Sequence, residues 1–483
     1  MKSAHLICAC VLTLCGLAAA QTKAVQTKSA PGTSTTSVAM AHDPAVPPTG
    51  YASVTADFNG DGIMDLATTN GKNGGITIRL GKGDGTFLAP VTYSYRYHYD
   101  AIVAGDFNND GKVDLAVSVP FLCNGCGGEP SFILHVFFGA GDGTFTLATT
   151  KYKFYGLPIA AGDFNGDGNL DLIVTNTSYD GTDWTPLILL GNGKGGFQLG
   201  SSLGDTFWLT RPAVGDFNGD GKLDIAMPAF DFYYGNPITS VYMGNGDGTF
   251  AAPVTYTSPQ SWATTAAVGD FNGDGKLDIA TDGIQVLLNN GDGTFTNDAS
   301  VNVYGSGSTG GVAVGDFNGD GKLDFAAGAS LTGAGTSYVL LGAGDGTFQT
   351  VTVDGGPVLQ AADFNGDGKL DLLTPNGIFL QTPASLLPTS LNFGDVPVNT
   401  ISPSQSMTLT NVGNVAMTIK SLTLTGASSF TQSNTCGASL ASGASCTIQA
   451  VFAPTASGNA SAVISVKVPG APPSTVTLVG YGY

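Results

Sequence analysis

The sequence predicts an all-β protein, with a seven-bladed β-propeller followed by a β-sandwich. The first observation is a nine-residue phrase, D-x-N-x-D-G-x-x-D, whose seven copies begin 46 to 57 residues apart. The second is a Gly-Asp-Gly-Thr-Phe phrase, or a close variant, that follows each of the first six copies. The third is a change after Pro383, where both phrases stop and short runs alternate polar with apolar residues. A period near fifty residues is typical of propellers and other repeat arrays.

Each repeat contains the four strands that a blade needs. One strand precedes the nine-residue phrase, a second follows it, and the glycine phrase separates a third from a fourth, which predicts a four-stranded antiparallel blade. Some strands, such as residues 132–138, are almost continuously apolar, so we expect both faces to be buried between blades. The seventh unit has a third strand at Ile378 to Gln381 and no fourth. We expect segment 37–41 to supply it and to close a propeller that spans residues 46–382.

The nine-residue phrase has the composition of a calcium loop. Side-chain oxygens stand at its first, third, fifth and ninth positions, the seventh offers a backbone carbonyl, and a Gly at the sixth allows a tight turn. An EF-hand is excluded, because its twelfth position needs a Glu and this chain has Thr, Val, Met or Ala there. The alternative is that Asp, Asn and Gly merely form turns. Seven intact copies favour calcium, with up to seven structural ions. The predicted metal ligands are Asp57, Asn59, Asp61, Asp65, Asp106, Asn108, Asp110, Asp114, Asp163, Asn165, Asp167, Asp171, Asp216, Asn218, Asp220, Asp224, Asp270, Asn272, Asp274, Asp278, Asp316, Asn318, Asp320, Asp324, Asp363, Asn365, Asp367 and Asp371.

The start of the chain predicts export. Residues 1–20 are typical of a secretory signal peptide, because Lys2 precedes an apolar run that ends in three Ala residues. A lipoprotein signal ending at Cys15 is the alternative, although the bulky Leu14 precedes that Cys. Residues 21–45 form a Thr, Ser, Ala and Pro-rich flexible linker. No later stretch is long and apolar enough to span a membrane, so we expect an extracellular, periplasmic or cell-surface protein.

The net charge of −19 reflects the repeats rather than a partner, because the seven phrases hold 21 of the 37 acidic residues. Without a basic stripe to neutralise phosphates, we do not expect a nucleic-acid partner.

The cysteines outside the signal peptide form two local pairs, Cys123 with Cys126 and Cys436 with Cys446. Both are expected to be disulfides, since disulfides persist in exported proteins. For the first pair a redox motif and half of a zinc site stay open as alternatives. The chain offers neither a βαβ context nor a second Cys/His pair for them.

The repeats resemble FG-GAP (VCBS) repeats, the blades of the integrin α-subunit head. The resemblance covers about residues 50–382 and rests on both phrases recurring in phase. It implies a seven-bladed propeller with calcium in the hairpin between the first two strands of a blade. It does not imply integrin function, since one fold hosts many functions.

Residues 387–483 predict an immunoglobulin-like β-sandwich, because their strands alternate at period two between Gly, Asn and Pro turns. No Trp lies between Cys436 and Cys446, so the domain is not antibody-like. The phrases Leu-Asn-Phe-Gly at 391–394 and Phe-Ala-Pro-Thr at 452–455 make it similar to abnormal-spindle/hydin-like (choice-of-anchor D type) domains of bacterial surface proteins.

The variable loops are the predicted recognition surface. In a propeller the two repeated turns share one face, so the variable loops share the opposite one. These loops contain most of the aromatic residues that lie outside the repeated phrases and strands, and all three Trp. This composition is typical of the hot spots of protein–protein interfaces and of sites where an aromatic ring stacks on a sugar. The alternative is that the aromatics cap the core. The predicted partner-binding residues are Tyr97, His98, Trp184, Trp208, Arg211, Tyr233 and Trp262.

Catalysis has little support in the sequence, which lacks a nucleophile elbow, a zinc-binding His pair and a free carboxylate pair. We therefore expect a calcium-binding protein that mediates adhesion or recognition of an extracellular protein or glycan. The alternatives are a calcium-dependent lectin and a polysaccharide lyase or hydrolase, which could use His98, Arg96 or Arg211 with Tyr97.

Overall fold

The computed structural model describes most of the chain beyond the linker. The described residues are 40–43, 52–70, 74–94, 99, 101–122, 130–148, 157–177, 184–204, 210–231, 236–258, 263–297, 311–329, 336–354, 358–366, 368–374, 377–381, 383–388, 390–411, 416–469 and 473–483. Their regular structure consists of strands alone. The predicted signal peptide lies outside this part of the chain.

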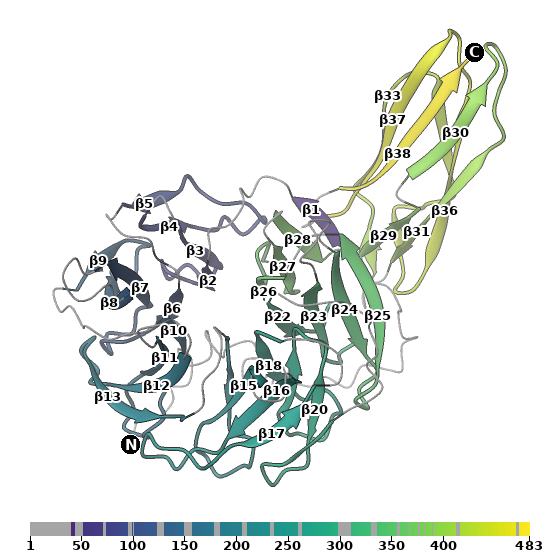
Figure 1. The fold of residues 1–483 in the computed structure, drawn as a ribbon. Helices are drawn as coiled ribbons and strands as arrows, with labels where there is room; N and C mark the ends of the chain where they lie inside the picture. Colours follow the sequence, from purple (N-terminus) through teal and green to yellow (C-terminus); the bar gives the residue numbers. More distant parts are fainter. Residues whose placement is uncertain are drawn as a thin grey trace.

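Seven separate four-stranded antiparallel sheets form the blades of a ring (Figure 1). Blade 1 consists of β2 (Ser53–Ala56), β3 (Asp65–Thr69), β4 (Ile76–Arg79) and β5 (Val91–Tyr93). Blade 2 consists of β6 (Ile102–Gly105), β7 (Asp114–Leu122), β8 (Pro130–Gly139) and β9 (Phe145–Leu147). Blade 3 consists of β10 (Leu157–Gly162), β11 (Asp171–Thr177), β12 (Trp184–Gly191) and β13 (Phe197–Ser202). Blade 4 consists of β14 (Ala213–Gly215), β15 (Asp224–Asp231), β16 (Asn236–Tyr242) and β17 (Val254–Thr257).

The remaining three blades follow the same order. Blade 5 consists of β18 (Ala266–Gly269), β19 (Asp278–Thr281), β20 (Val286–Asn289) and β21 (Phe295–Asn297). Blade 6 consists of β22 (Val312–Gly315), β23 (Asp324–Ala329), β24 (Thr336–Gly342) and β25 (Phe348–Asp354). Blade 7 consists of β26 (Gln360–Ala362), β27 (Asp371–Thr374), β28 (Gly377–Gln381) and, as its outer strand, β1 (Met40–Asp43).

The outer strand of blade 7 comes from the start of the chain. Strand β1 pairs antiparallel with β28, with Met40 opposite Gln381 and Asp43 opposite Ile378. The closing strand was expected at 37–41. The described pairing covers 40–43, and residues 37–39 are outside the described part. The last blade is therefore completed by both ends of the propeller sequence.

The core of the propeller lies between the blades. In the described part of the chain, seven apolar clusters each join two neighbouring blades. One of them packs Leu66 of blade 1 against Leu373 and Leu380 of blade 7. Strand β3 is buried along its whole length, which confirms that both faces of this inner strand are covered. Hydrogen bonding between strands stops at each blade, so packing between blades closes the ring.

The C-terminal domain is a sandwich of two four-stranded sheets that projects from the ring (Figure 1). The first sheet has the order β29 (Ala384–Leu387), β31 (Gln405–Asn411), β36 (Ser445–Phe452) and β34 (Phe430–Asn434). The second has the order β30 (Ser390–Val396), β38 (Ser474–Gly482), β37 (Gly458–Lys467) and β33 (Ser421–Gly426). A short pair, β32 (Met417–Thr418) and β35 (Ser439–Leu440), completes the strands. Buried and exposed residues alternate along β38, which confirms the predicted period of two.

Candidate metal centres and the opposite loop face

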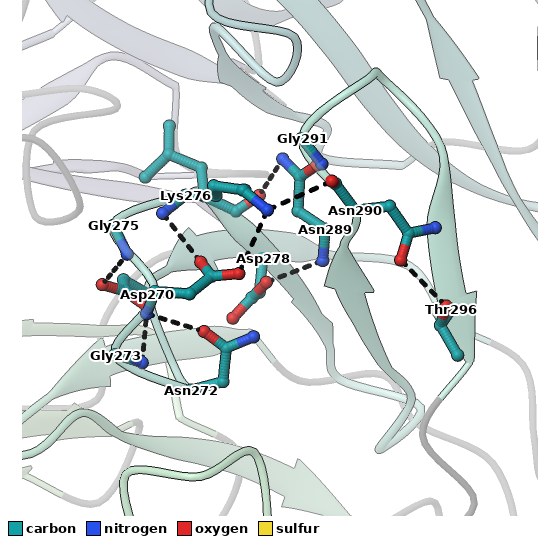
Figure 2. A network of polar contacts seen from close by, with 12 residues as sticks. Asp270, Asn272, Gly273, Gly275, Lys276, Asp278, Asn289, Asn290, Gly291 and Thr296 are labelled. Carbon is teal, nitrogen blue, oxygen red and sulfur yellow. Dashed lines mark hydrogen bonds and ion pairs between the residues drawn. The ribbon is translucent and has the colours of Figure 1, made fainter.

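Each nine-residue phrase, here called an aspartate loop, forms the turn between the first two strands of a blade. The loop of blade 5 shows the pattern (Figure 2). Asp270 Oδ1 accepts hydrogen bonds from the backbone N–H groups of Gly273 and Asp274, at 2.7 and 3.0 Å, and its Oδ2 accepts one from Gly275 at 2.9 Å. Asn272 Oδ1 accepts from the N–H of Asp274 at 2.9 Å. The side-chain oxygens of the first and third residues therefore accept N–H groups of the residues that follow them and hold the backbone in a tight turn, as in an Asx turn.

Two positions of the loop require a left-handed backbone. Gly60 and Gly62 of blade 1 have φ of 78° and 82°. Blade 2 has Asn109 in place of the first of these glycines, with φ of 60°. Asn is one of the few side chains that tolerate this region, so the turn keeps its shape there.

The ninth aspartate of each loop is a buried acceptor of two backbone N–H groups. In blade 5, Asp278 Oδ2 accepts from Phe271 at 2.9 Å and Oδ1 from Asn289 at 2.8 Å. The same two bonds occur in every blade, through Asp65, Asp114, Asp171, Asp224, Asp324 and Asp371. This aspartate was expected to close the metal shell. Its two bonds also tie the loop to the end of the third strand, a role that sequence reasoning missed.

Burial of the ninth aspartates raises their pKa values. The pKa rises to about 7 for Asp114 and to about 6 for Asp65, Asp171 and Asp278. Desolvation is the largest cause, the two backbone bonds oppose it, and the first and fifth aspartates of the same loop raise the pKa further. The loops therefore concentrate negative charge that a bound cation would relieve.

A lysine ammonium lies beside the loop carboxylates of two blades. Lys276 Nζ is 3.3 Å from Asp274 Oδ2 and donates to the carbonyl of Asn290 at 3.1 Å (Figure 2). Lys222 Nζ is likewise 3.6 Å from Asp220 Oδ2 in blade 4. In these two blades a lysine therefore places a positive charge beside the fifth-position carboxylate.

The glycine phrase, here called the glycine turn, reaches back to the aspartate loop of the preceding blade. Its third residue donates its backbone N–H to the carbonyl of the Phe at the loop's second position. The pairs are Gly85 with Phe364, Gly143 with Phe58, Gly195 with Phe107, Gly248 with Phe164 and Gly346 with Phe271, at 2.7 to 3.2 Å. These contacts put aspartate loops and glycine turns on one face of the ring, as predicted.

Two blades make the backward contact with a side chain instead. In blade 5, Asn289 Nδ2 donates to the carbonyl of Phe217 at 2.8 Å. Blade 7 lacks a glycine turn, and Gln381 Nε2 donates to the carbonyl of Asp316 at 3.4 Å. The other five blades have Gly at this third-strand end, so the amide side chains mark the two exceptions in the sequence. All seven loops are thus held by the following blade.

The oxygen donors of the aspartate loop suit a hard cation such as calcium. Asp, Asn and Asp at alternate positions of one tight turn provide carboxylate and amide oxygens, the donors that calcium takes. Among the described residues, no three His, Cys, Asp or Glu side chains form a metal-binding cluster. The full ligand set of each loop, the ninth aspartate included, stays a prediction, and Asp367 of blade 7 lies outside the described part.

Of the predicted partner-binding residues, Arg211 is the one whose side chain the structure describes. It is exposed and lies immediately before β14, where its backbone bridges to Thr265 at the entrance of blade 5. Although Arg211 is in contact with solvent, the protein that surrounds it displaces part of its hydration and lowers the pKa of its guanidinium, and the neighbouring carboxylate of Asp282 opposes that shift. Trp184 begins β12, and its side chain is not described. Tyr97, His98, Trp208, Tyr233 and Trp262 lie outside the described residues.

Two aromatic groups of the loops belong to the core. Tyr99 is fully buried, and its hydroxyl is hydrogen-bonded to Nδ1 of the buried His135 at 3.1 Å. Tyr93 accepts the backbone N–H of Phe145, in the next blade, at 2.9 Å. At these two positions the core-capping interpretation is correct.

The predicted disulfide between Cys436 and Cys446 is present, with a Cα–Cα distance of 5.0 Å. The Cys123 and Cys126 pair lies outside the described residues. In the described part of the chain no helix is long and apolar enough to cross a membrane.

Comparison with family models finds both domains. An FG-GAP-like repeat matches residues 57–117, 163–227, 231–281 and 280–327, and a HYDIN/CFA65/VesB-like Ig-like domain matches residues 385–482. No curated protein matches the chain.

Solved structures with similarity to the chain include a propeller, an ASH/PapD-like domain and a secreted serine protease. The Dos1 propeller is 12% identical with a TM-score of 0.39, over 68% of this chain and 76% of its own. The ASH/PapD-like domain 7 of human CEP192 is 16% identical with a TM-score of 0.18, over 21% of this chain and 86% of its own. The secreted serine protease VesC from Vibrio cholerae is 10% identical with a TM-score of 0.20, over 54% of this chain and 64% of its own. The strand pairing, rather than these likenesses, defines the two folds.

Proposed function

We propose that this chain, which carries FG-GAP-like repeats and a HYDIN/CFA65/VesB-like Ig-like domain, is an exported calcium-binding protein that recognises an extracellular partner. Calcium has a structural role, with up to seven ions on the face formed by aspartate loops and glycine turns. The opposite loop face contacts the partner, which is a protein or a glycan.

The observation that carries the calcium proposal is the backward contact of every blade on an aspartate loop. An ion that fixes a loop also fixes the carbonyl to which the next blade is bonded, so binding strengthens the ring between blades. Ions that bind only the folded chain stabilise it by mass action. Extracellular calcium modules typically bind at about 0.1 to 1 mM.

Calorimetric titration of metal-free residues 21–483 tests this proposal. We expect several calcium ions to bind and the melting temperature to rise with calcium concentration. The double substitution Asp270→Asn with Asp274→Asn replaces two carboxylates of one loop with neutral amides, which bind calcium more weakly, and should lower the stoichiometry by about one. Unchanged stoichiometry in this variant, or no calcium heat in the wild type, would refute the proposal.

The recognition proposal rests on Arg211, an exposed cation whose backbone is fixed on the face away from the acidic loops. Arg with aromatic neighbours is the composition that dominates protein and sugar interfaces. A screen of residues 21–483 against polysaccharides and matrix proteins tests it, with Arg211→Ala as the variant and Lys467→Ala, an exposed cation of the second domain, as the control. Retention that Arg211→Ala leaves intact would argue against this face.

The same screen separates the alternatives. Calcium-dependent glycan retention without product identifies a lectin. New reducing ends or unsaturated products identify a polysaccharide hydrolase or lyase, and retention on proteins alone identifies an adhesion module.

A further inference from the structure

The second domain has a groove on the outer face of the sheet formed by β30, β38 and β37. The groove is open to solvent along the sheet and has a volume of about 410 Å³. The floor consists of Val479, Gly480 and Tyr481, and the walls include Asn459 and Ser461 of β37 and Asp395 of β30. Val479 and Tyr481 are 37% and 39% exposed, although the side chains alternating with them are buried.

A β-bulge in the edge strand shapes one wall of the groove. Along the parallel pair of β30 and β38, Asn392 lies opposite Val479 and Asp395 opposite Tyr481, so two residues of β30 face one of β38. Gly394 in the bulge has φ of 64°, and Asn392 Oδ1 caps its N–H at 2.9 Å. Bulges re-aim side chains next to functional sites. This one places the Asp395 carboxylate beside the tyrosine.

The floor is closed from below by the core. Gly480 points inward, and a Cβ at that position would lie 2.6 Å from the ring of Phe452. The position is therefore restricted to Gly. Only backbone separates the outward-facing side chains of Val479 and Tyr481 at this point of the groove. In the described part of the chain, the side chains of Asn459 and Ser461 make no hydrogen bond. Their donors and acceptors are therefore available to a ligand.

The chemistry of the lining selects among ligands. A half-exposed tyrosine ring beside an apolar Val offers a stacking surface with a polar edge, and Asn, Ser and Asp offer hydrogen bonds to hydroxyl groups. No cation lines the groove, and the Asp395 carboxylate repels anions. The bulge also interrupts the edge strand, which disfavours an added peptide strand.

We propose that this groove binds a neutral saccharide, with a pyranose ring stacked on Tyr481 and its hydroxyls bonded to Asn459, Ser461 and Asp395. The site lies in the second domain and uses no aspartate loop. It is therefore separate from the loop face of the propeller, and binding there needs no calcium ligand.

Titration calorimetry of residues 21–483 with neutral hexasaccharides tests the proposal. The probes are cellohexaose, laminarihexaose, xylohexaose and mannohexaose, with hexagalacturonate as the anionic comparison. We expect one or more neutral probes to bind and Tyr481→Ala to weaken binding by about tenfold, as loss of a central aromatic contact does. The control is Tyr483→Ala, since Tyr483 is 61% exposed and lies outside the groove. It should change affinity by less than about twofold.

A second variant, Asn459→Ala, removes a wall side chain that is exposed and makes no described hydrogen bond, so its fold should be unaffected. It should weaken the same probe while the melting temperature stays at the wild-type value. Binding that both groove variants leave intact would overturn the proposal. Equal affinity for hexagalacturonate, or no binding of any neutral probe, would also overturn it. Because Tyr481 is in the second domain, these outcomes leave the loop-face proposal untouched.

Discussion

The glycine turn of blade 3 gives the sharpest test of how neighbouring blades are joined. Gly195 has φ of 73°, and its N–H is bonded to the carbonyl of Phe107 in blade 2 at 2.7 Å. A Cβ added there would lie 2.3 Å from the ring of Phe138, also in blade 2. In Gly195→Ala either the turn or the ring must move, and the contact between the blades is disturbed.

The control is Gly204→Ala, in the same blade. Gly204 has φ of 82° but nothing within 4 Å of an added Cβ. Both variants share the backbone strain of a left-handed alanine, about 1 to 2 kcal/mol. Gly195→Ala adds overpacking of about 1 to 3 kcal/mol and weakens a hydrogen bond of about 1 kcal/mol. For a propeller of about 340 residues, the difference of about 2 to 4 kcal/mol corresponds to a melting temperature roughly 3 to 6 °C lower for Gly195→Ala than for Gly204→Ala.

Differential scanning calorimetry of both variants in saturating calcium measures this difference. Equal melting temperatures would refute the reasoning, because strain alone would then explain both changes. A larger effect in Gly204→Ala would show that the contact between blades 2 and 3 contributes little to the ring.

Three further predictions concern the loops and the ring. Asp278→Asn leaves one of two buried N–H groups without its acceptor and should lower the free energy of unfolding by about 1 to 3 kcal/mol. Asp292→Asn, on the exposed glycine turn, should lower it less. Denaturant titration of both variants measures the difference. Burial raises the pKa of Asp114 to about 7, so the folded state favours the protonated carboxyl. The stability from this group is present below pH 4 and is lost as pH rises through 7, so metal-free protein should melt lower at pH 8 than at pH 5. Calcium favours the ionised form and should raise the melting temperature most at pH 8; a calcium effect independent of pH would contradict this. A chain that begins at Gly50 lacks β1 and should melt below residues 21–483, and equal melting temperatures would show that β1 does not secure the ring.

The aspartate loop shows how far sequence reasoning reaches in this protein. The spacing of Asp, Asn and Gly predicts a turn, its place between two strands and its suitability for a hard cation, because each depends on residues adjacent in sequence. The second role of the ninth aspartate was not predictable in this way. Its partner N–H groups belong to Phe271 and to Asn289, one of which lies at the end of another strand.

The loop aromatics show the opposite limit. Tyr99 lies in an aromatic-rich loop that the sequence predicts to be exposed. It is nevertheless fully buried, and its hydroxyl is hydrogen-bonded to His135, 36 residues later in the sequence. Local composition cannot distinguish a side chain that caps the core from one that contacts a partner. The distinction depends on which blade covers it.

The sequence by itself determined the two domains, the number of blades and the co-facial turns, because a repeat carries its strand order and its phase in every copy. Only the tertiary structure decided which residues join one blade to the next, in which register the predicted closing strand pairs with β28, and that a bulge opens a groove beside Tyr481. These features depend on contacts between segments distant in the chain. The repeat pattern of the sequence cannot predict these contacts, because each depends on how the strands pack together.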